Sequence, residues 1–151
     1  MISRACARAL APRYTAAKMN MSMYALGMAE EFRDARPHPV AFNCLWPRTA
    51  IDTAAINVIT GPLTRKLCRS VDIMADAAHW VLSQPPRACT GQTFIDDEII
   101  AEHFPATDLD SYRADTSMMA RLAPLLPDFY VGDPASMEKY VDMARAVQKR
   151  L

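Results

Sequence analysis

The stretch from Tyr14 to Phe32 is the feature that most constrains the fold of this chain. It holds no proline and one glycine, Gly27, and Ala, Met and Leu, which are good helix formers, dominate it. The sequence therefore predicts a helix here. Apolar residues wrap most of its circumference, because the plainly polar groups before Ala29 are few: Lys18, Asn20, Ser22 and the hydroxyls of Tyr14, Thr15 and Tyr24. Such a helix has to be covered on more than one side, by its own sheet and by a partner.

Length and charge exclude several classes of protein. The 151 residues suffice for one ordinary domain, and 51% apolar with 23% charged residues is the balance of a folded globular protein. No apolar run approaches the roughly 20 residues that span a bilayer. Lys plus Arg and Asp plus Glu each total 17, so no net charge attracts nucleic acid or acidic lipid. We expect a small neutral ligand or another protein as partner, with no nucleic acid and no membrane span.

The cysteines and histidines are scattered along the sequence. There is no Cys-x-x-Cys pair, and no histidine lies at ligand spacing from a cysteine, so we expect neither a metal site nor a disulfide framework. We interpret the four cysteines as buried reduced thiols of a cytoplasmic protein: Cys6, Cys44, Cys68 and Cys89. Residues 1–18 are basic and contain no acid, a composition that fits a presequence and leaves a mitochondrial location as the alternative.

The middle of the chain predicts two short parallel strands separated by helices. Residues 40–46 form a mostly apolar run that stops at a proline, which is typical of a buried parallel strand. Residues 50–59 predict a short helix. Ser70 is a suitable N-cap for a longer helix, and residues 93–95 predict the second strand. The order helix, strand, helix, strand is typical of an α/β protein with a parallel sheet and a right-handed crossover.

The last third of the sequence predicts an extension on this α/β unit. Residues 105–133 are punctuated by prolines and predict irregular structure. Asp133-Pro134 is a favourable helix start, and the residues that follow form one apolar stripe: Met137, Tyr140, Val141, Ala144 and Val147. We therefore predict one domain over residues 1–104 and an extension over residues 105–151, with an amphipathic helix from about residue 134.

Tyr14 and Lys18 are four residues apart, hence on one face of the predicted helix and one turn from each other. An ordinary tyrosine has a pKa near 10, and a nearby cation stabilises the phenolate and lowers that pKa. A tyrosine in such a setting can act as a general acid and base at neutral pH. Many helices carry this spacing without any function, so the segments that follow decide what it means.

The order of these segments resembles the short-chain dehydrogenase/reductase family. In that family a Tyr-x-x-x-Lys helix is followed by a buried strand ending in Asn-x-x-x-Pro, a loop with threonines, a helix, and a last strand introduced by Thr-Gly. Here Asn43 and Pro47 match the strand end, Thr49 and Thr53 supply the hydroxyls, and Thr90-Gly91 introduces the last strand. The matching segments cover about residues 12–131.

Within the family, the sequence resembles the hydroxysteroid dehydrogenase-like branch. Three segments resemble its sequence almost residue for residue: 21–32, 43–51 and 73–78. Arg48 stands where most of the family has glycine, although a basic residue is normal in this branch. The fold that the resemblance implies is the C-terminal half of a Rossmann-like, doubly wound parallel sheet, dominated by helices, with short strands at about 40–46 and 93–95. Residues 1–104 would then be a partial Rossmann-like domain.

The resemblance implies an NAD(P)-dependent oxidoreductase that interconverts alcohols and carbonyls. Tyr14 would exchange a proton with the substrate oxygen, while Lys18 would hold the ribose hydroxyls and lower the pKa of the tyrosine. The nicotinamide carboxamide would be met by the loop after the first strand, through Pro47, Thr49, Ala50, Ile51 and Thr53. The substrate would be a small alcohol or carbonyl compound with a lipid-like leaning. Helix 14–32 would join copies of the chain in a homo-oligomer.

One part of the family pattern is not found in this sequence. The Gly-rich turn that seats the pyrophosphate and the catalytic serine of the family have no counterpart among the 13 residues before Tyr14. We therefore expect an incomplete chain that is inactive in isolation. The residues that distinguish NAD from NADP belong to the same part, so either cofactor stays open. The alternative function is a non-catalytic remnant that acts as an interaction module through helix 14–32.

Overall fold

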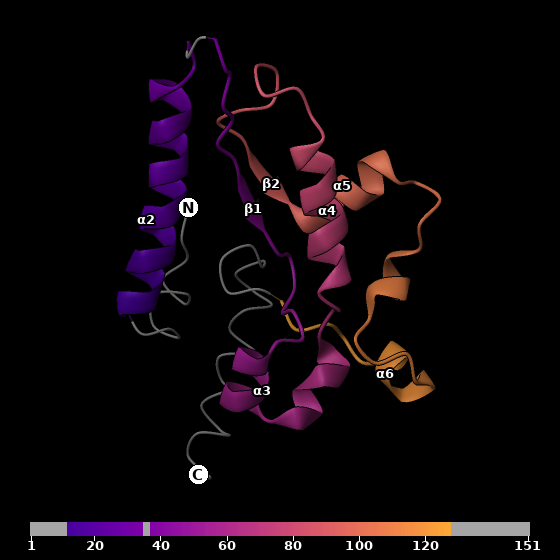
Figure 1. Ribbon diagram of the computed structural model, residues 1–151. Coiled ribbons are helices and arrows are strands. Elements are labelled where there is room, and N and C mark those ends of the chain that lie inside the picture. The colour runs from indigo at the N-terminus through magenta and orange to yellow at the C-terminus, as the bar shows by residue number, and fades with distance from the viewer. Residues whose placement is uncertain (1–11, 35–36, 128–151) are drawn as a thin grey trace.

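The computed structural model describes residues 12–34 and 37–127 and shows a helix-rich α/β arrangement around a two-stranded sheet (Figure 1). Its helices are α2 (Pro12–Glu31), α3 (Ala54–Thr60), α4 (Asp72–Leu82), α5 (Asp96–His103) and α6 (Met118–Leu122). Its strands are β1 (Cys44–Trp46) and β2 (Thr93–Ile95), and its 3₁₀ turns are η1 (Pro62–Leu67) and η2 (Leu109–Tyr112). The α/β class predicted from the sequence is confirmed.

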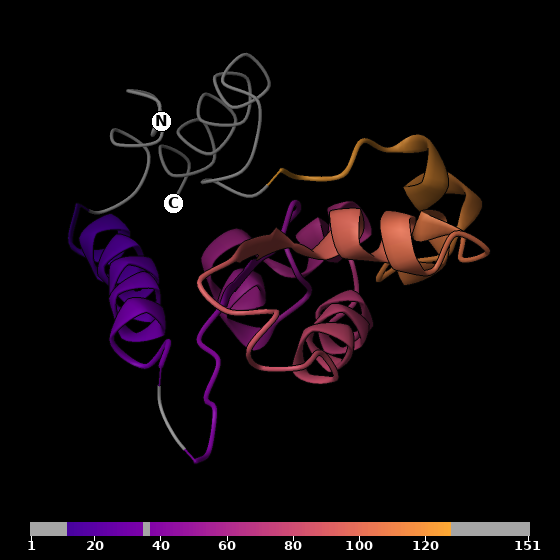
Figure 2. The same cartoon turned by 90° about the horizontal axis from the view of Figure 1, so that it is seen from above.

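The two strands are parallel neighbours, with Cys44 opposite Thr93 and Trp46 opposite Ile95. Helices α2 and α4 lie on opposite sides of the strand pair, as Figures 1 and 2 show. Parallel strands connected through helices, with helices on both sides, are the doubly wound arrangement. The predicted Rossmann-like fold with two short parallel strands is therefore confirmed.

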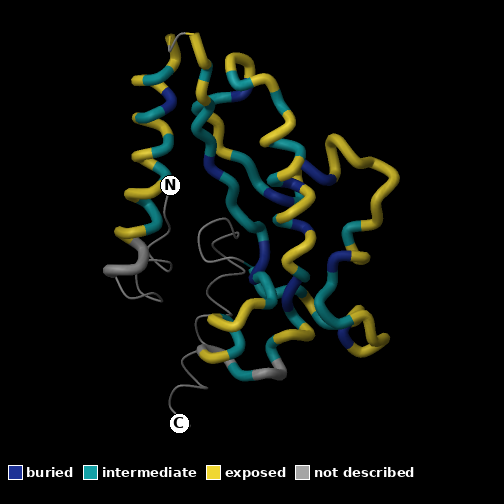
Figure 3. The backbone as a smooth tube through the Cα atoms, viewed as in Figure 1, coloured by how far each residue is buried: buried dark blue, intermediate teal, exposed yellow. Residues whose placement is uncertain are grey.

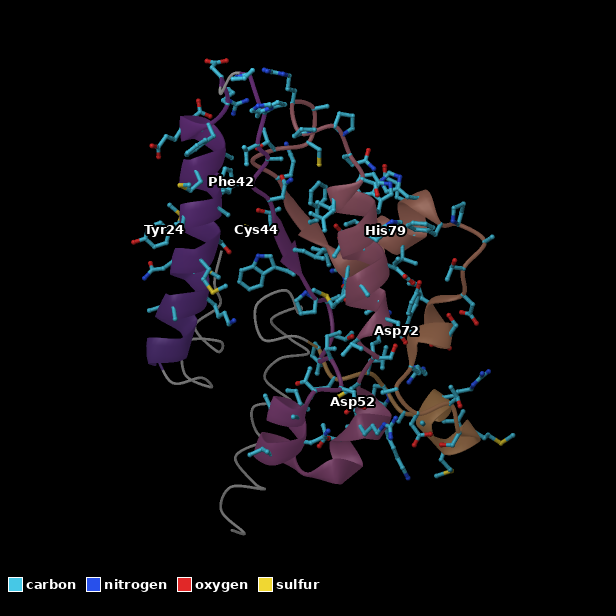
Figure 4. The ribbon with its side chains drawn as sticks, viewed as in Figure 1. Tyr24, Phe42, Cys44, Asp52, Asp72 and His79 are labelled. Atoms are coloured by element: carbon cyan, nitrogen blue, oxygen red, sulfur yellow. The ribbon has the colours of Figure 1, made fainter. Side chains whose placement is uncertain are left out.

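Helix α2 matches the helix predicted from Tyr14 to Phe32 and packs beside β1. The rings of Phe32 and Phe42 have centroids 5.6 Å apart, and the Cys44 thiol donates to the Ser22 carbonyl at 3.8 Å. Phe42 and Cys44 lie between the helix and the strand, whereas Tyr24 points away from the sheet (Figure 4). The outer face of the helix is strongly exposed, at Met21 (61%), Met23 (67%) and Tyr24 (74%). Only one side of this apolar helix is therefore covered by the described part of the chain.

Strand β1 begins four residues later than predicted. Residues 40–43 stay outside the ladder because the turn before β2 uses the backbone of Phe42. The Gly91 N–H donates to the Phe42 carbonyl at 2.8 Å, and the Phe42 N–H donates to Thr90 Oγ1 at 3.2 Å. Gly91 adopts a φ of +70°, in the left-handed region that favours glycine, and a Cβ there would lie 3.4 Å from that of Ala29. The Thr-Gly pair therefore shapes the turn that brings the two strands together.

Asn43 ties the same turn to the start of β1. Its Nδ2 donates to the Cys89 carbonyl at 2.9 Å, and its Oδ1 accepts the Gln92 N–H at 2.9 Å. The asparagine of the family motif thus has a structural task in this chain, because both ends of its amide bind backbone groups of the turn.

The starts of the two helices after β1 differ from the prediction. Helix α3 begins four residues late, and Thr53 caps it by accepting the Ile56 N–H at 3.4 Å. Helix α4 has Val71 at its N-cap rather than Ser70. The Ser70 hydroxyl still accepts a first-turn N–H, from Asp72 at 3.3 Å. A side-chain acceptor therefore serves the start of both helices, as expected for N-terminal amides.

The core lies between α4, α5 and η2. Ile73 and Ile100 are completely buried and pack with Tyr112. The Tyr112 hydroxyl donates to Asp76 Oδ2 at 2.6 Å, which anchors η2 on α4. Figure 3 shows buried backbone segments, in dark blue, within α4 and α5.

Helix α5 was not predicted from the sequence. It has eight residues, which are too few for a clear apolar period. Its first turn carries Asp96, Asp97 and Glu98, and negative charge is favourable at a helix N-terminus. The acidic run directly after the second strand was the signal for this helix.

The extension from residue 105 is largely irregular over its described part, as predicted, apart from η2 and α6. The predicted helix from about residue 134 and Cys6 lie outside the described residues, and the boundary at 104/105 stays a prediction. Over residues 12–34 and 37–127, no helix combines the length and hydropathy needed to cross a membrane. The described cysteines are buried, as predicted, and form no disulfide with one another: Cys44, Cys68 and Cys89.

Candidate active site

Tyr14 and Lys18 both lie in α2, one turn apart. The side chain of Lys18 is half-buried, and that of Tyr14 lies outside the described side chains. Helix α2 and β1 run in opposite directions, because Phe32 contacts Phe42 while the earlier Ser22 contacts the later Cys44. The N-terminal end of α2, which carries Tyr14 and Lys18, therefore lies toward the C-terminal end of β1 (Figure 1).

The predicted nicotinamide loop, residues 47–53, leaves β1 at this end of the sheet. Its backbone is held from two sides at the buried residue Ala50. The Ala50 N–H donates to the Leu126 carbonyl at 2.8 Å, and the Ala50 carbonyl accepts the Arg69 N–H at 3.0 Å. In this conformation the Ala50 N–H is therefore committed within the protein. Pro47 and Ile51 are half-buried in the same loop.

The two threonines of the loop differ in what they can offer a ligand. Thr49 is buried, and its Oγ1 has no hydrogen-bond partner among the described residues. A buried polar group left in this state costs about 1–3 kcal/mol, so a ligand or a water molecule that binds it is favoured. Thr53 is exposed, and its Oγ1 caps α3. Of the two threonine hydroxyls, that of Thr49 is therefore the one that lacks a hydrogen-bond partner in the described structure.

A charged cluster that the sequence reasoning missed supports this loop. Asp97 accepts from Arg48 Nε at 2.8 Å and from Arg69 Nη1 at 3.2 Å, and Glu98 also pairs with Arg48. The bond to Asp97 raises the pKa of the Arg48 guanidinium above its ordinary value. A basic residue after the first strand and acids after the second were the available signal, since the carboxyl ends of parallel strands meet at one edge of a sheet. The cluster ties those two ends together.

Asp96 lies completely buried beside this cluster. Its Oδ1 accepts the N–H of Arg48 and the N–H of Asp97, each at 2.8 Å. Its Oδ2 is buried without a partner in the part of the chain that the structure describes. Burial raises the pKa of the Asp96 carboxyl, and the two backbone N–H donors oppose that shift. Asp96 therefore fixes the amide directly after Pro47, at the start of the loop.

The described side chains do not form a metal site. Across residues 12–34 and 37–127, no three His, Cys, Asp or Glu side chains come together as a ligand set. What the described residues provide is a half-buried ammonium group on α2, a buried hydroxyl in loop 47–53, and a loop backbone held by hydrogen bonds. Polar groups of these kinds bind polar organic molecules.

Sequence comparison connects the chain to dehydrogenase-like proteins, although no family profile matches it. It is 44% identical over 130 residues to hydroxysteroid dehydrogenase-like protein 2 of Danio rerio, covering 85% of this chain and 29% of that protein. It is 42% identical over 135 residues to the Homo sapiens protein of the same name, covering 89% of this chain and 30% of that protein. The chain thus spans about three tenths of the length of these relatives.

Comparison of folds also finds dehydrogenases. A putative dehydrogenase from Xanthomonas campestris matches with a TM-score of 0.66 at 45% identity, over 80% of this chain and 40% of that protein. A short chain dehydrogenase from Mycobacterium thermoresistibile matches with a TM-score of 0.65 at 36% identity over the same shares. By sequence the chain is similar to hydroxysteroid dehydrogenase-like protein 2, and by fold it is similar to short-chain dehydrogenases, which is the resemblance that its motifs predicted.

Proposed function

We propose that this chain carries the proton-transfer helix and the nicotinamide loop of an NAD(P)-dependent oxidoreductase that interconverts alcohols and carbonyls. One observation carries the proposal: the end of α2 with Tyr14 and Lys18 lies toward the end of β1 from which loop 47–53 emerges. The relatives in sequence and fold are dehydrogenases or are named as dehydrogenase-like, which supports an oxidoreductase in general.

In the proposed reaction, Tyr14 passes a proton to or from the substrate oxygen through its hydroxyl. Lys18, one turn along α2, stabilises the phenolate by its positive charge and binds the ribose hydroxyls. When it is bound, a nicotinamide dinucleotide supplies or accepts the hydride. The substrate is a small alcohol or carbonyl compound of lipid-like character.

The loop after β1 fits the nicotinamide end of such a cofactor. Thr49 offers a buried hydroxyl without a partner in the described structure, and a hydroxyl can both donate to and accept from a carboxamide. Pro47 and Ile51 flank it, and Thr53 offers a second, exposed hydroxyl. Ala50 contributes by its place between them, since Leu126 holds its N–H. The proposed cofactor set is therefore Lys18 together with these five residues of the loop.

The relatives are longer than this chain, so the experiment places it in a complete framework. In a chimera, the matched 80% of this chain replaces the matched 40% of the Xanthomonas campestris dehydrogenase. Circular dichroism verifies folding, and turnover of a panel of secondary alcohols and their ketones is measured with NAD(H) and NADP(H). We expect turnover with one of the two cofactors. A folded chimera without turnover would count against the proposal.

Variants on α2 then test the roles of its two residues. Tyr14→Phe should abolish turnover and leave cofactor affinity nearly unchanged, because it removes only the proton-transfer hydroxyl. Tyr24→Phe is the matched control, since Tyr24 is an exposed tyrosine on the same helix. Lys18→Met should weaken both cofactor binding and rate. Residual activity of Tyr14→Phe within about tenfold of the parent would contradict its assigned role.

The second candidate is a non-catalytic interaction module, and the exposed apolar face of α2 favours it. Met21, Met23 and Tyr24 are each more than 60% exposed, which is typical of an association surface. The same face is where we propose that copies of the oxidoreductase assemble as a homo-oligomer. Light scattering of the parent chimera and of Met23→Glu measures this association. Self-association with no turnover in a folded chimera would favour the module, whereas turnover favours the enzyme.

A cytoplasmic location, with the mitochondrion as alternative, completes the proposal. The described cysteines are buried and form no disulfides with one another, which suits a reducing compartment. Burial raises the pKa of Cys68 to about 11, so its thiol is protonated and inert at neutral pH.

A further inference from the structure

Four separate segments of the chain pair side by side at the end of the sheet where loop 47–53 lies. Their pairings join Pro127 to Thr49 (antiparallel), Ile51 to Arg69 (parallel), and Arg69 to Arg113 (antiparallel). The segments therefore lie in the order 127, 49–51, 69, 113. We call this arrangement the loop ladder. It lies outside the named strands β1 and β2.

Short backbone hydrogen bonds build each step of the loop ladder. They are Ala50 N–H to Leu126 O (2.8 Å), Leu126 N–H to Leu67 O (2.7 Å), Arg69 N–H to Ala50 O (3.0 Å), Asp52 N–H to Arg69 O (2.8 Å), Ser70 N–H to Tyr112 O (2.6 Å) and Ala114 N–H to Cys68 O (3.1 Å). Five of the six distances lie in the usual range for N–H···O hydrogen bonds, and the Ser70 bond is slightly shorter. The loop after β1 is thus held on both sides by parts of the chain distant in sequence.

Both outer edges of the loop ladder come from the extension after residue 104. One edge is at Arg113, directly after η2, and the other is at Leu126 and Pro127, after α6. Between them the chain turns through α6, so the extension leaves one edge and returns at the other. The segments in the middle, 49–52 and 67–70, are the two ends of the excursion that holds α3 and η1. The extension therefore pairs with both ends of the segment that holds α3 and η1.

Arg113 connects the two edges. Its Nη1 donates to the carbonyls of Ala120 and Ala123 at 3.0 and 3.2 Å, and its Nε donates to Asp110 Oδ1 at 2.9 Å. Its side chain is only 9% exposed. Ala120 lies within α6 and Ala123 is its C-cap, and the Ala120 carbonyl also accepts the Ala123 N–H at 3.1 Å. A cation is favourable at this end of a helix. Arg113 thus sets where the chain leaves α6, shortly before it reaches Leu126.

We propose that residues 112–127 are a clamp that holds the nicotinamide loop in shape, and that Arg113 is a positioning residue for the reaction. This inference rests on the proposed function, because it assumes that loop 47–53 meets the cofactor. By binding the carbonyls of α6, the Arg113 guanidinium positions Leu126, whose carbonyl accepts the Ala50 N–H. Arg113 also directly follows Tyr112, whose carbonyl accepts the Ser70 N–H. A loop fixed in advance loses less conformational freedom when a ligand binds, so the clamp favours cofactor affinity.

The first test uses the full 151-residue chain and needs no activity. Amide hydrogen exchange is measured at Ala50, which donates to one edge of the loop ladder, and at Ser70, which donates to the other. Arg113→Met should raise exchange at both amides by about tenfold or more, because it frees both edges. Arg113→Lys, which keeps the charge, should give an intermediate rise. Arg121→Met is the matched control, since Arg121 is an exposed arginine on α6, and it should leave both amides unchanged.

A second variant guards against general unfolding of Arg113→Met. Leu126→Pro removes the N–H that donates to the Leu67 carbonyl and so releases only one edge. It should raise exchange at Ala50 and leave Ser70 protected. Wild-type exchange at Ala50 in both variants would overturn the clamp.

The kinetic test uses the chimera with the Xanthomonas campestris dehydrogenase. Arg113→Met should raise KM for the dinucleotide by about tenfold or more and lower kcat less, because Tyr14 and Lys18 are untouched. Arg113→Lys should restore part of the affinity, and Arg121→Met should match the parent. Faster exchange with unchanged KM and kcat would overturn the positioning role. A folded parent chimera without turnover would refute the proposed function and with it the positioning role, while the exchange data would still decide whether the clamp exists.

Discussion

Replacing Asp96 by asparagine tests whether the buried carboxyl beside the loop is a pH-dependent element of stability. Asp96 is completely buried, Oδ1 accepts two backbone N–H groups at 2.8 Å, and Oδ2 has no partner within the described structure. Asparagine has the same shape, keeps an oxygen for the two N–H groups and carries no charge. The variant therefore removes the buried charge and leaves the hydrogen bonds to Arg48 and Asp97 in place.

The sign of the effect follows from the raised pKa of Asp96. A carboxyl whose pKa is higher in the folded than in the unfolded chain favours folding most at low pH, below its unfolded pKa. That contribution is lost as the pH rises through the folded pKa. Asparagine does not titrate, so the stability of Asp96→Asn relative to wild type should rise with pH above about 4 and then level off. The height of the plateau measures how far the folded and unfolded pKa values lie apart, because a tenfold difference in proton affinity is worth about 1.4 kcal/mol.

Urea unfolding of both chains between about pH 3 and 8, followed by circular dichroism, measures this difference. Asp96→Ala is the companion variant, because it removes the oxygen as well as the charge. It should destabilise the chain by about 1–3 kcal/mol for each buried N–H that is left without an acceptor. A stability difference between Asp96→Asn and wild type that stays flat across the whole pH range would refute the reasoning, since Asp96 would then titrate alike in both states.

Two further variants test the contacts that hold the sheet and the core. Asn43→Asp should destabilise the chain by about 1–3 kcal/mol at neutral pH, because a carboxylate replaces the donor to the Cys89 carbonyl. Part of the lost stability should return at low pH, where the carboxyl is protonated. Urea unfolding at two pH values measures both effects. Tyr112→Phe should cost about 1 kcal/mol through the lost bond to Asp76. Because burial and that bond raise the pKa of Tyr112 to about 12, the wild-type advantage is full below about pH 10 and fades toward 12, and alkaline unfolding of both chains would show the curves converge. Curves that stay parallel would contradict the role given to Tyr112.

Local chemistry in the sequence was sufficient for the elements that depend on near neighbours. Helix α2 follows from its run of helix formers, and β2 follows from a short apolar run after a Thr-Gly turn, so both were predicted to within two residues. The motif from Tyr14 to Thr53 also predicted the dehydrogenases to which the comparisons show similarity. Its assigned roles stay predictions, since they concern a cofactor and a substrate.

Tertiary structure decided the rest, because the partners concerned are far apart in the chain. β1 starts at Cys44 rather than at residue 40 since the turn before β2 occupies the backbone of Phe42. The cluster of Arg48, Arg69 and Asp97 exists only when the two strand ends meet. The loop ladder likewise pairs backbone groups, which every residue carries, and so leaves no pattern of side chains in the sequence. Only the folded chain could show that the extension holds the loop.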